Sequence, residues 1–329
     1  MKRHKICKII LAILAVFLCV AFYELIGICI TYKKQPTVSD ATIKETQNIM
    51  SVAGRENTER AVIIEKNSQA LLERVRLIQN AKDEIILSTF AFKSDESGKL
   101  ILGALHDAAD RGVHVRILVD GMESWIDMEG NPYFYGLSSH ENVEIKLYNK
   151  ANPLKPWKTM GRMHDKYLIA DGKIYILGGR NTYNYFLGDF PGHKNFDRDV
   201  LVVCDEPQKD NSVNQLWNYF ETIWEQEDCR YFHNSKKLAD RQSVKKAVLE
   251  LQEGYQQYFE VNKEKICDTD YADETFETEK IILLSNPIHT QAKEPVVWYQ
   301  LGELMKNAKE RVKIHTPYII CNDMMYNTW

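Results

Sequence analysis

A histidine and a lysine two residues apart, followed by an asparagine, are the residues whose types and spacing suit chemistry on a phosphate. His164 and Lys166 lie in a stretch that reads H-x-K-x4-D and ends at Asp171. After a gap of six residues, G-G-x-N begins at Gly178 and ends at Asn181. A neutral imidazole is nucleophilic near pH 7 and leaves readily afterwards. Ammonium and carboxamide N–H groups stabilise charge on phosphoryl oxygens. The pattern indicates nucleophilic attack on a phosphate, for which we expect no metal and no other cofactor.

A short β-hairpin would bring these groups to one face. Asp171-Gly172 is a preferred two-residue turn of the I′ type, and the residues on both sides have strand composition. With that turn, residue i pairs with residue 343 − i, so His164 lies opposite Gly179. Because side chains alternate along a strand, His164, Lys166 and Asn181 share one face. Gly179 then leaves space for a phosphate beside the imidazole, and Asp171 is a structural turn residue.

The hairpin is part of a longer α/β rhythm. Residues 68–80 and 100–111 have helical periodicity, whereas residues 84–92 and 113–119 are rich in strand formers. This alternation predicts a sheet with crossover helices. Before the motif, Lys158 and Arg162 belong to a basic stretch that is suited to an anionic headgroup; a solvated basic loop is the alternative.

Residues 61–329 resemble the phospholipase D superfamily, particularly bacterial cardiolipin synthases. The resemblance is carried by the sequence RMHDKYLIADGKIYILGGRNTYNYF … FDRDVLVV. The resemblance implies an α/β sandwich of mixed sheet flanked by helices. It also implies a phosphatidyltransferase that forms a phosphohistidine on His164 and passes the phosphatidyl group to an alcohol such as phosphatidylglycerol. An acid about thirty residues after the histidine orients the imidazole in such relatives. Asp197 fits that place best and Asp199 second; pairing with Arg198 or solvation at the strand edge is the alternative for both.

An internal repeat suggests that a second unit begins near the end of the sequence. Residues 80–89, a helix-to-strand junction, recur as residues 307–316, where His315 would end a second strand. We therefore expect one complete unit at 61–275 and the start of a second at 276–329. The resembling family uses two H-x-K motifs, and a second copy would fall about sixty residues beyond Trp329. We expect truncation relative to a two-motif ancestor and little turnover by the chain alone, with a homodimer as another way to pair two motifs.

The N-terminus has the composition of a membrane anchor. Residues 1–8 are basic, residues 9–32 are apolar apart from Glu24, and residues 33–60 are polar and read as a linker. As a helix, the apolar run would extend about 36 Å, enough to cross a bilayer. The basic cluster predicts a single-pass anchor with a cytoplasmic N-terminus and an extracytoplasmic domain in the cell membrane. A cleaved signal peptide is the alternative.

The bulk composition narrows the class of partner. The formal net charge of −4 argues against a dedicated nucleic-acid binder. The resemblance to cardiolipin synthases implies a phospholipid resembling phosphatidylglycerol, and a membrane, as partners. Two alternatives stay open, namely an extracytoplasmic phosphodiesterase or nuclease of the same superfamily and a non-catalytic binder of anionic lipid. A Cys229–Cys267 disulfide also stays open, whereas the scattered cysteines disfavour a zinc site.

Overall fold

The computed structural model describes residues 2–51, 58–316, 318 and 326, and the chain divides into two units. Unit 1 comprises Met1–Arg55, Asn152–Gly161 and Leu283–Trp329, and unit 2 comprises Glu56–Ala151 and Arg162–Ile282. Unit 2 thus extends a few residues beyond the expected domain at both ends and excludes a ten-residue segment directly before the motif.

Unit 2 is built on a mixed nine-stranded sheet in the order β8-β4-β3-β2-β5-β6-β7-β1-β9. The strands are β1 (Arg60–Ile64), β2 (Glu84–Thr89), β3 (His114–Asp120), β4 (Val143–Tyr148), β5 (Tyr167–Ala170), β6 (Ile174–Gly178), β7 (Asp199–Val203), β8 (Cys229–Tyr231) and β9 (Phe276–Glu277). β2, β3 and β4 are mutually parallel, and β5 pairs antiparallel with β2. The parallel and antiparallel parts of the sheet therefore meet between β2 and β5.

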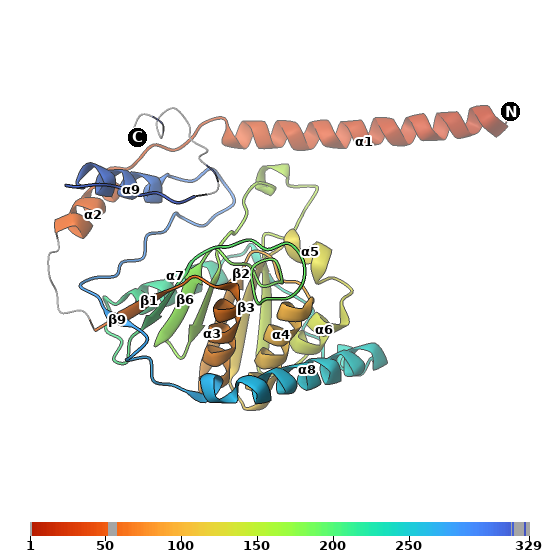
Figure 1. Cartoon of the computed structure of the whole chain (residues 1–329). Helices are drawn as coiled ribbons and strands as arrows, with labels where there is room; N and C mark the ends of the chain where they lie inside the picture. The colour runs from red at the N-terminus through yellow and green to blue at the C-terminus, as the bar shows by residue number, and fades with distance from the viewer. Residues whose placement is uncertain (1, 52–57, 317, 319–325, 327–329) are drawn as a thin grey trace. The chain divides into compact units, whose positions relative to one another are not determined.

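Helices cover both faces of this sheet, as Figure 1 shows. One face carries α3 (Asn67–Asn80), α4 (Glu96–Asp110), α6 (Pro132–Ser138) and α8 (Gln242–Cys267), whose apolar residues join one core cluster with alternate strand residues. The opposite face carries α7 (Ser212–Trp224), where the Arg116 guanidinium lies 4.8 Å from the Phe220 ring centre. The short α5 (Glu123–Asp127) and η2 (Lys236–Leu238) complete unit 2. This is the mixed sheet flanked by helices that the sequence predicted.

The periodicity predictions for the first half of unit 2 are confirmed. The two expected helices are α3 and α4, and the two expected strands are β2 and β3. α4 begins where Asp95 accepts a hydrogen bond from the backbone N–H of Gly98 at 3.1 Å, a side-chain cap of the helix N-terminus. The thiols of Cys229 and Cys267 are free, so the disulfide that the sequence left open is not formed.

The β5–β6 hairpin has a different register from the predicted one. Asp171 and Gly172 both have positive φ, as a type I′ turn requires, and Lys173 N–H donates to the Ala170 carbonyl at 3.0 Å. Ala170 nevertheless pairs with Ile174, so Lys173 is an extra loop residue and residue i pairs with residue 344 − i. The predicted 343 − i register is wrong, because the loop has three residues and not two.

Asp171 fastens this loop to the connection between α3 and β2. Its carboxylate accepts hydrogen bonds from the backbone N–H groups of Lys82 (2.9 Å), Asp83 (2.9 Å) and Glu84 (3.0 Å). In addition, Asp171 N–H donates to the Glu84 carbonyl at 2.9 Å. Two N–H groups just before β2 and that of its first residue thereby find acceptors, and β5 is held beside β2 at this end.

Unit 1 contains α1 (Lys2–Tyr32), α2 (Asp40–Ser51), η1 (Pro156–Lys158) and α9 (Val296–Lys306). Within α1, the stretch His4–Tyr32 is long and apolar enough to cross a bilayer by length and composition, and no other described helix is. α2 falls inside the expected linker, whose residues 52–57 lie outside the described part. The Glu294 carboxylate accepts from Ser39 N–H (2.7 Å) and Thr42 hydroxyl (2.6 Å) at the start of α2.

The second strand expected from the repeat is not formed. Residues 311–316 have no regular secondary structure, and Pro317 lies outside the described residues. A strand needs a neighbour to satisfy its backbone N–H and C=O groups. The described residues of unit 1 form no strand, so residues 311–316 have no strand to pair with in that unit.

We expect Gly103→Ala to destabilise unit 2. An added Cβ at this position in α4 would lie 2.6 Å from the Leu251 carbonyl oxygen and 2.8 Å from Cβ of Tyr255 in α8. Separating two packed helices typically costs about 1–3 kcal/mol of unfolding free energy. Gly254→Ala is the matched control, because its Cβ meets nothing within 4 Å and should stabilise α8 by up to about 1 kcal/mol. Chemical denaturation measures both, and equal midpoints would contradict the close packing of α4 on α8.

We expect Asp171→Ala to loosen the start of β2. Removing the acceptor of three backbone N–H groups should lower the free energy of unfolding by about 2–3 kcal/mol. Asp171→Asn is the control, since it keeps one carboxamide oxygen and tolerates positive φ. Hydrogen exchange of the amides at 82–84 is the direct readout. Unchanged protection of these amides in Asp171→Ala would show that the carboxylate does not hold them.

Candidate functional site

The candidate site lies where the segments that follow β2 and β6 run side by side. Thr182 N–H donates to the Ala91 carbonyl at 3.1 Å, and Lys93 N–H donates to the Thr182 carbonyl at 3.2 Å. Phe92 and Thr182 form an isolated parallel bridge. The segment after the carboxyl end of β2 is thereby hydrogen-bonded to the segment that follows the G-G-x-N motif. Phe90 and Ala91 lie at this junction.

His164 and Lys166 both pack against Phe90. The imidazole and phenyl ring centres are 4.6 Å apart, and the Lys166 Nζ lies 5.3 Å from the phenyl centre. Lys166 Nζ also donates to the His164 carbonyl at 2.6 Å, which fixes one of its three N–H groups. The lysine side chain is buried, whereas His164 is exposed to solvent. The phenyl ring thus supports an accessible imidazole beside a buried ammonium.

Asn181 reaches the same junction through its carboxamide. Its Oδ1 accepts the backbone N–H of Ala91 at 3.1 Å, and the side chain is buried. With the oxygen engaged, the amide is fixed in orientation and its NH2 group has no hydrogen bond among the described residues. His164, Lys166 and Asn181 therefore all contact the short segment Phe90–Ala91, although the hairpin register is not what brings them there.

The space that was expected beside Gly179 is filled. A Cβ at Gly179 would collide with the carboxylate of Asp197, so this acid occupies the place where the sequence analysis put a phosphate. In the observed register Lys166 lies across from Gly178, whose N–H donates to the Lys166 carbonyl at 3.2 Å. Beyond Gly178 the β5–β6 ladder stops, and Asn181 is positioned by Ala91.

The electrostatics of the pair follow from burial. Burial lowers the pKa of Lys166 to about 8, although nearby carboxylates, chiefly Asp165 and then Asp197, act in the opposite direction. Partial burial and then the Lys166 charge lower the pKa of His164 below its ordinary value. At pH 7 the imidazole is therefore mainly neutral. The Lys166 amine is mainly charged, because one pH unit below its pKa the ratio of protonated to neutral amine is about ten to one.

The two acids after the motif have different surroundings. Asp199 is fully buried and forms ion pairs with Arg74 at 2.9 Å and Arg180 at 3.3 Å. Asp197 is half-buried, and its Oδ1 accepts the Arg198 N–H at 2.7 Å. The His164 imidazole has no hydrogen bond to a carboxylate within the described residues, so the expected orienting bond from Asp197 is not formed in this structure. Instead, Asp197 contributes negative charge near Lys166.

The two basic residues proposed for substrate binding fall in different units. Arg162, in unit 2, forms an ion pair with the buried Asp120 at 3.2 Å, and its guanidinium also donates to the Asn149 carbonyl. Met163 N–H donates to the same Asp120 carboxylate at 3.1 Å. Arg162 therefore helps to hold the irregular segment that leads to His164. Lys158 lies in η1 of unit 1.

Sequence reasoning did not single out Phe90, Asp120 or Arg180. Phe90 directly follows β2 and Asp120 ends β3, so both stand at the carboxyl ends of parallel strands, where α/β sheets commonly place functional groups. That rule was the available signal. Arg180 is fully buried and donates to the Asn67 carboxamide oxygen at 3.1 Å, a long-range contact with no local signature.

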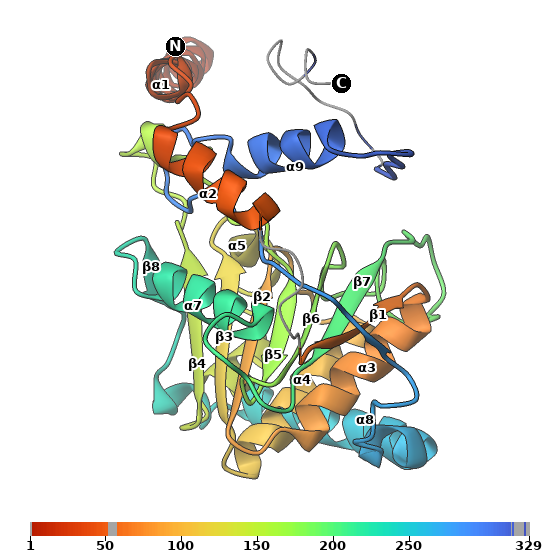
Figure 2. The same cartoon turned by 90° about the vertical axis from the view of Figure 1, so that its left-hand side faces the viewer.

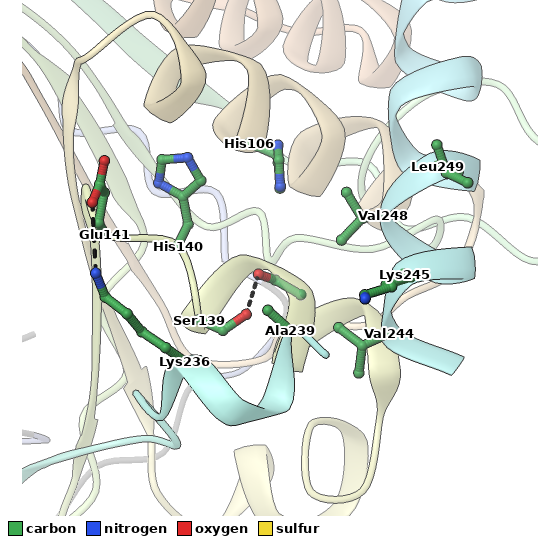
Figure 3. Close-up of a pocket in the computed structure, with 11 residues that line it drawn as sticks. His106, Ser139, His140, Glu141, Lys236, Ala239, Val244, Lys245, Val248 and Leu249 are labelled. Atoms are coloured by element: carbon green, nitrogen blue, oxygen red, sulfur yellow. Dashed lines mark hydrogen bonds and ion pairs between the residues drawn. The ribbon is translucent and has the colours of Figure 1, made fainter. Parts of the chain in front are cut away.

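A separate pocket of about 560 Å³ is lined by residues of α4, α6, α8 and η2 and by the segment that precedes β4. Figure 3 shows His106 of α4 and His140, which precedes β4, near Val244, Val248 and Leu249 of α8. Asp110 bridges the two imidazoles, at 3.0 Å from His106 Nδ1 and 3.2 Å from His140 Nε2. The sequence-predicted site residues are not among those that line this pocket.

The arrangement at Phe90 suits nucleophilic chemistry on a phosphate ester. It offers a neutral, accessible imidazole, an ammonium with two further N–H groups, and a fixed carboxamide with a free NH2 group. Such donors stabilise the charge that develops on phosphoryl oxygens.

Comparison with known proteins identifies the domain that carries these residues. Residues 75–224 match the family model described as cardiolipin synthase, PLD-like domain. An uncharacterized protein of Helicobacter pylori is 27% identical over 292 residues, which are 80% of this chain and 55% of that protein. Cardiolipin synthase C of Escherichia coli is 29% identical over 154 residues, or 43% of this chain and 31% of that enzyme. The chain thus spans about half, or less, of the length of these relatives.

Among solved structures, the phospholipase D family member Nuc from Salmonella typhimurium is 20% identical, with a TM-score of 0.38, over 53% of this chain and 98% of that chain. The family match of residues 75–224 and the cardiolipin synthase relatives support a phospholipase D superfamily, cardiolipin synthase-like protein.

Proposed function

We propose that the chain is a phosphatidyltransferase of the cardiolipin synthase type, which exchanges phosphodiesters of phospholipids through a phosphohistidine on His164. The observation that carries this proposal is the packing of an exposed imidazole against Phe90, with 4.6 Å between ring centres and 60° between ring planes, and the Lys166 ammonium near the same ring. The match of residues 75–224 to a cardiolipin synthase domain supports the phosphatidyl group as the transferred unit.

The proposed reaction has two balanced steps. In the first, a neutral nitrogen of His164 attacks the phosphorus of one phospholipid, the bond from phosphorus to the departing alcohol breaks, and that alcohol takes up a proton from water. In the second, the hydroxyl of an acceptor lipid such as phosphatidylglycerol attacks the phosphohistidine and loses its proton to water, and the bond from phosphorus to the imidazole nitrogen breaks. A neutral imidazole is both nucleophile and leaving group in this scheme, which suits its lowered pKa.

Lys166 and Asn181 have the proposed role of binding the non-bridging oxygens. The Lys166 ammonium is buried, so its attraction to a phosphoryl oxygen is less screened than at the surface. The Asn181 carboxamide is fixed by Ala91 and presents N–H donors without further reorganisation. Asp197, which lies against Gly179, is proposed to keep Lys166 charged and, once substrate is bound, to orient the imidazole.

A lipid substrate agrees with the N-terminal helix. α1 is long and apolar enough to cross a bilayer, and together with the cardiolipin synthase relatives it indicates membrane association. We propose a single-pass anchor with a cytoplasmic N-terminus, on the charge rule applied to residues 2–8. The beginning of a second phospholipase D-like unit in residues 276–329 also remains part of the proposal.

One motif supplies the attacking imidazole of the first covalent step but no second imidazole to protonate the alcohol that departs in that step, which leaves water as the proton donor. Removing one partner of a concerted catalytic set typically costs several orders of magnitude in rate. We therefore expect slow turnover by the 329-residue chain, so the informative assay measures adduct formation and not product accumulation.

We expect the chain to acquire an acid-labile label from phosphatidylglycerol that carries radioactive phosphate, and His164→Ala to reduce this labelling at least 100-fold. The reason is that the variant lacks the attacking nitrogen. His114→Ala at the opposite end of β3 is the matched control and should label like the wild type. The measurement is protein-bound radioactivity after an acid-free quench, followed by acid treatment.

The same assay distinguishes the nuclease alternative. Labelled DNA replaces the lipid in a parallel reaction at equal phosphate concentration. Labelling by DNA and not by lipid would overturn the assignment of a phosphatidyltransferase. Labelling by lipid that persists in His164→Ala would overturn the assignment of the nucleophile.

We expect the rate of adduct formation to depend on pH with two limbs. The rate should rise as His164 loses its proton, with a midpoint below 6.5, because only the neutral imidazole attacks. It should fall with a midpoint of about 8, because the pKa of Lys166 is about 8 and the neutral amine no longer attracts the phosphate. Lys166→Arg should shift the alkaline limb upward, since a guanidinium stays charged. A wild-type rate that stays level up to pH 10 would contradict the role of the ammonium.

A further inference from the structure

The segment Asn152–Gly161, named here the interface loop, packs against the C-terminal part of α1. The Tyr23 hydroxyl of α1 donates to the Leu154 carbonyl at 3.3 Å, and the Thr159 hydroxyl donates to the Glu24 carboxylate at 3.2 Å. A Cβ added at Gly27 would lie 2.5 Å from Cγ of Pro156. Glu24, the acid that interrupts the apolar run, therefore has a hydrogen-bond partner, and the loop approaches the helix closely at Gly27.

The loop is internally bonded and presents apolar side chains outward. Lys155 N–H donates to the Asn152 carbonyl (2.9 Å) and Lys158 N–H to the Lys155 carbonyl (2.9 Å). Within the loop, Leu154 is 78% exposed, Met160 58% and Trp157 41%. Backbone groups that are satisfied internally tolerate a poorly hydrated environment, and exposed leucine, methionine and tryptophan gain free energy there.

The contact falls at the boundary of the membrane span. A helix needs about twenty residues to cross the hydrocarbon core, so counting from Lys8 places the far boundary near Ile28. Tyr23, Glu24 and Gly27 lie within about one and a half turns of that residue. Tyrosine and tryptophan concentrate at such boundaries, where the ring is apolar and the polar atom is hydrated.

We propose that the interface loop is a second membrane contact, which inserts Leu154, Trp157 and Met160 into the headgroup–acyl boundary of an anionic bilayer while α1 holds it there. Lys155 and Lys158 on the same loop supply the positive charge that complements anionic headgroups. The partner is the lipid surface itself. The proposal does not rest on the phosphatidyltransferase assignment, because a membrane-anchored chain of any activity would make this contact.

The test places a photoreactive benzoylphenylalanine at position 154 of the full chain in vesicles of phosphatidylglycerol and phosphatidylethanolamine. Mass spectrometry after irradiation counts lipid adducts per chain. Position 261 on α8 is the matched control, because Val261 is 84% exposed in unit 2. We expect several-fold more lipid adduct at 154 than at 261. Equal capture at the two positions would overturn the insertion of the loop.

A second variant tests whether α1 holds the loop. Gly27→Leu keeps α1 apolar but places a side chain where Pro156 packs. We expect this variant to remain in the membrane fraction and to lose most of the lipid capture at position 154. Undiminished capture in Gly27→Leu would overturn the docking of the loop on α1. Neither readout requires turnover, so a failure of the proposed chemistry leaves both outcomes interpretable.

Discussion

The antiparallel pairing of β5 with β2 is the constraint on which the rest of unit 2 depends. Ser88 lies opposite Tyr167, so the residues that follow β2 and those that precede β5 leave the sheet at the same edge. That pairing is what sets the Phe90 ring beside His164 and Lys166. The Asp171 carboxylate secures the other end of the same two strands through three backbone N–H groups. A change in this register would separate the imidazole from its phenyl support whatever happened elsewhere.

Burial gives the lysine at the junction its character. An ammonium that is excluded from water but remains mostly charged at neutral pH is a strong local source of positive potential. The neighbouring carboxylates keep that charge in place, and the same charge helps to keep the imidazole neutral. The two titrating groups therefore have opposite preferred protonation states at one pH, a condition that general rules of catalysis associate with paired roles.

Local sequence patterns were enough to predict much of unit 2. Features that depend on contacts between residues far apart in the sequence could not be predicted in this way. The helices α3 and α4 could be predicted from apolar residues at helical spacing, and β2 and β3 from short continuous apolar runs, since both strands are buried on both faces. The hairpin was predictable, but its register was not, since nothing local marks Lys173 as an extra loop residue.

The supports of the site were hidden for a related reason. Phe90, Ala91 and Asp120 act through partners 42 to 90 residues away in the chain. α2 was missed because its stretch is polar, and its first turn is held by Glu294, more than 250 residues later. In each case the decisive contact joins distant parts of the chain, so only the three-dimensional structure exhibits it.

The place of β1 in the sheet has a consequence for biosynthesis. Ile64 of β1 pairs with Asp199, the first residue of β7. The ribosome must therefore add 135 residues, 199 − 64, after Ile64 before its partner exists. At ribosomal speeds of 5–20 residues per second that delay is on the order of ten seconds. Throughout it, the apolar Ala61–Ile64 segment has an unpaired edge while the nascent chain is still growing. Protection by a chaperone or by the insertion machinery during that interval would keep this edge from pairing with another nascent chain.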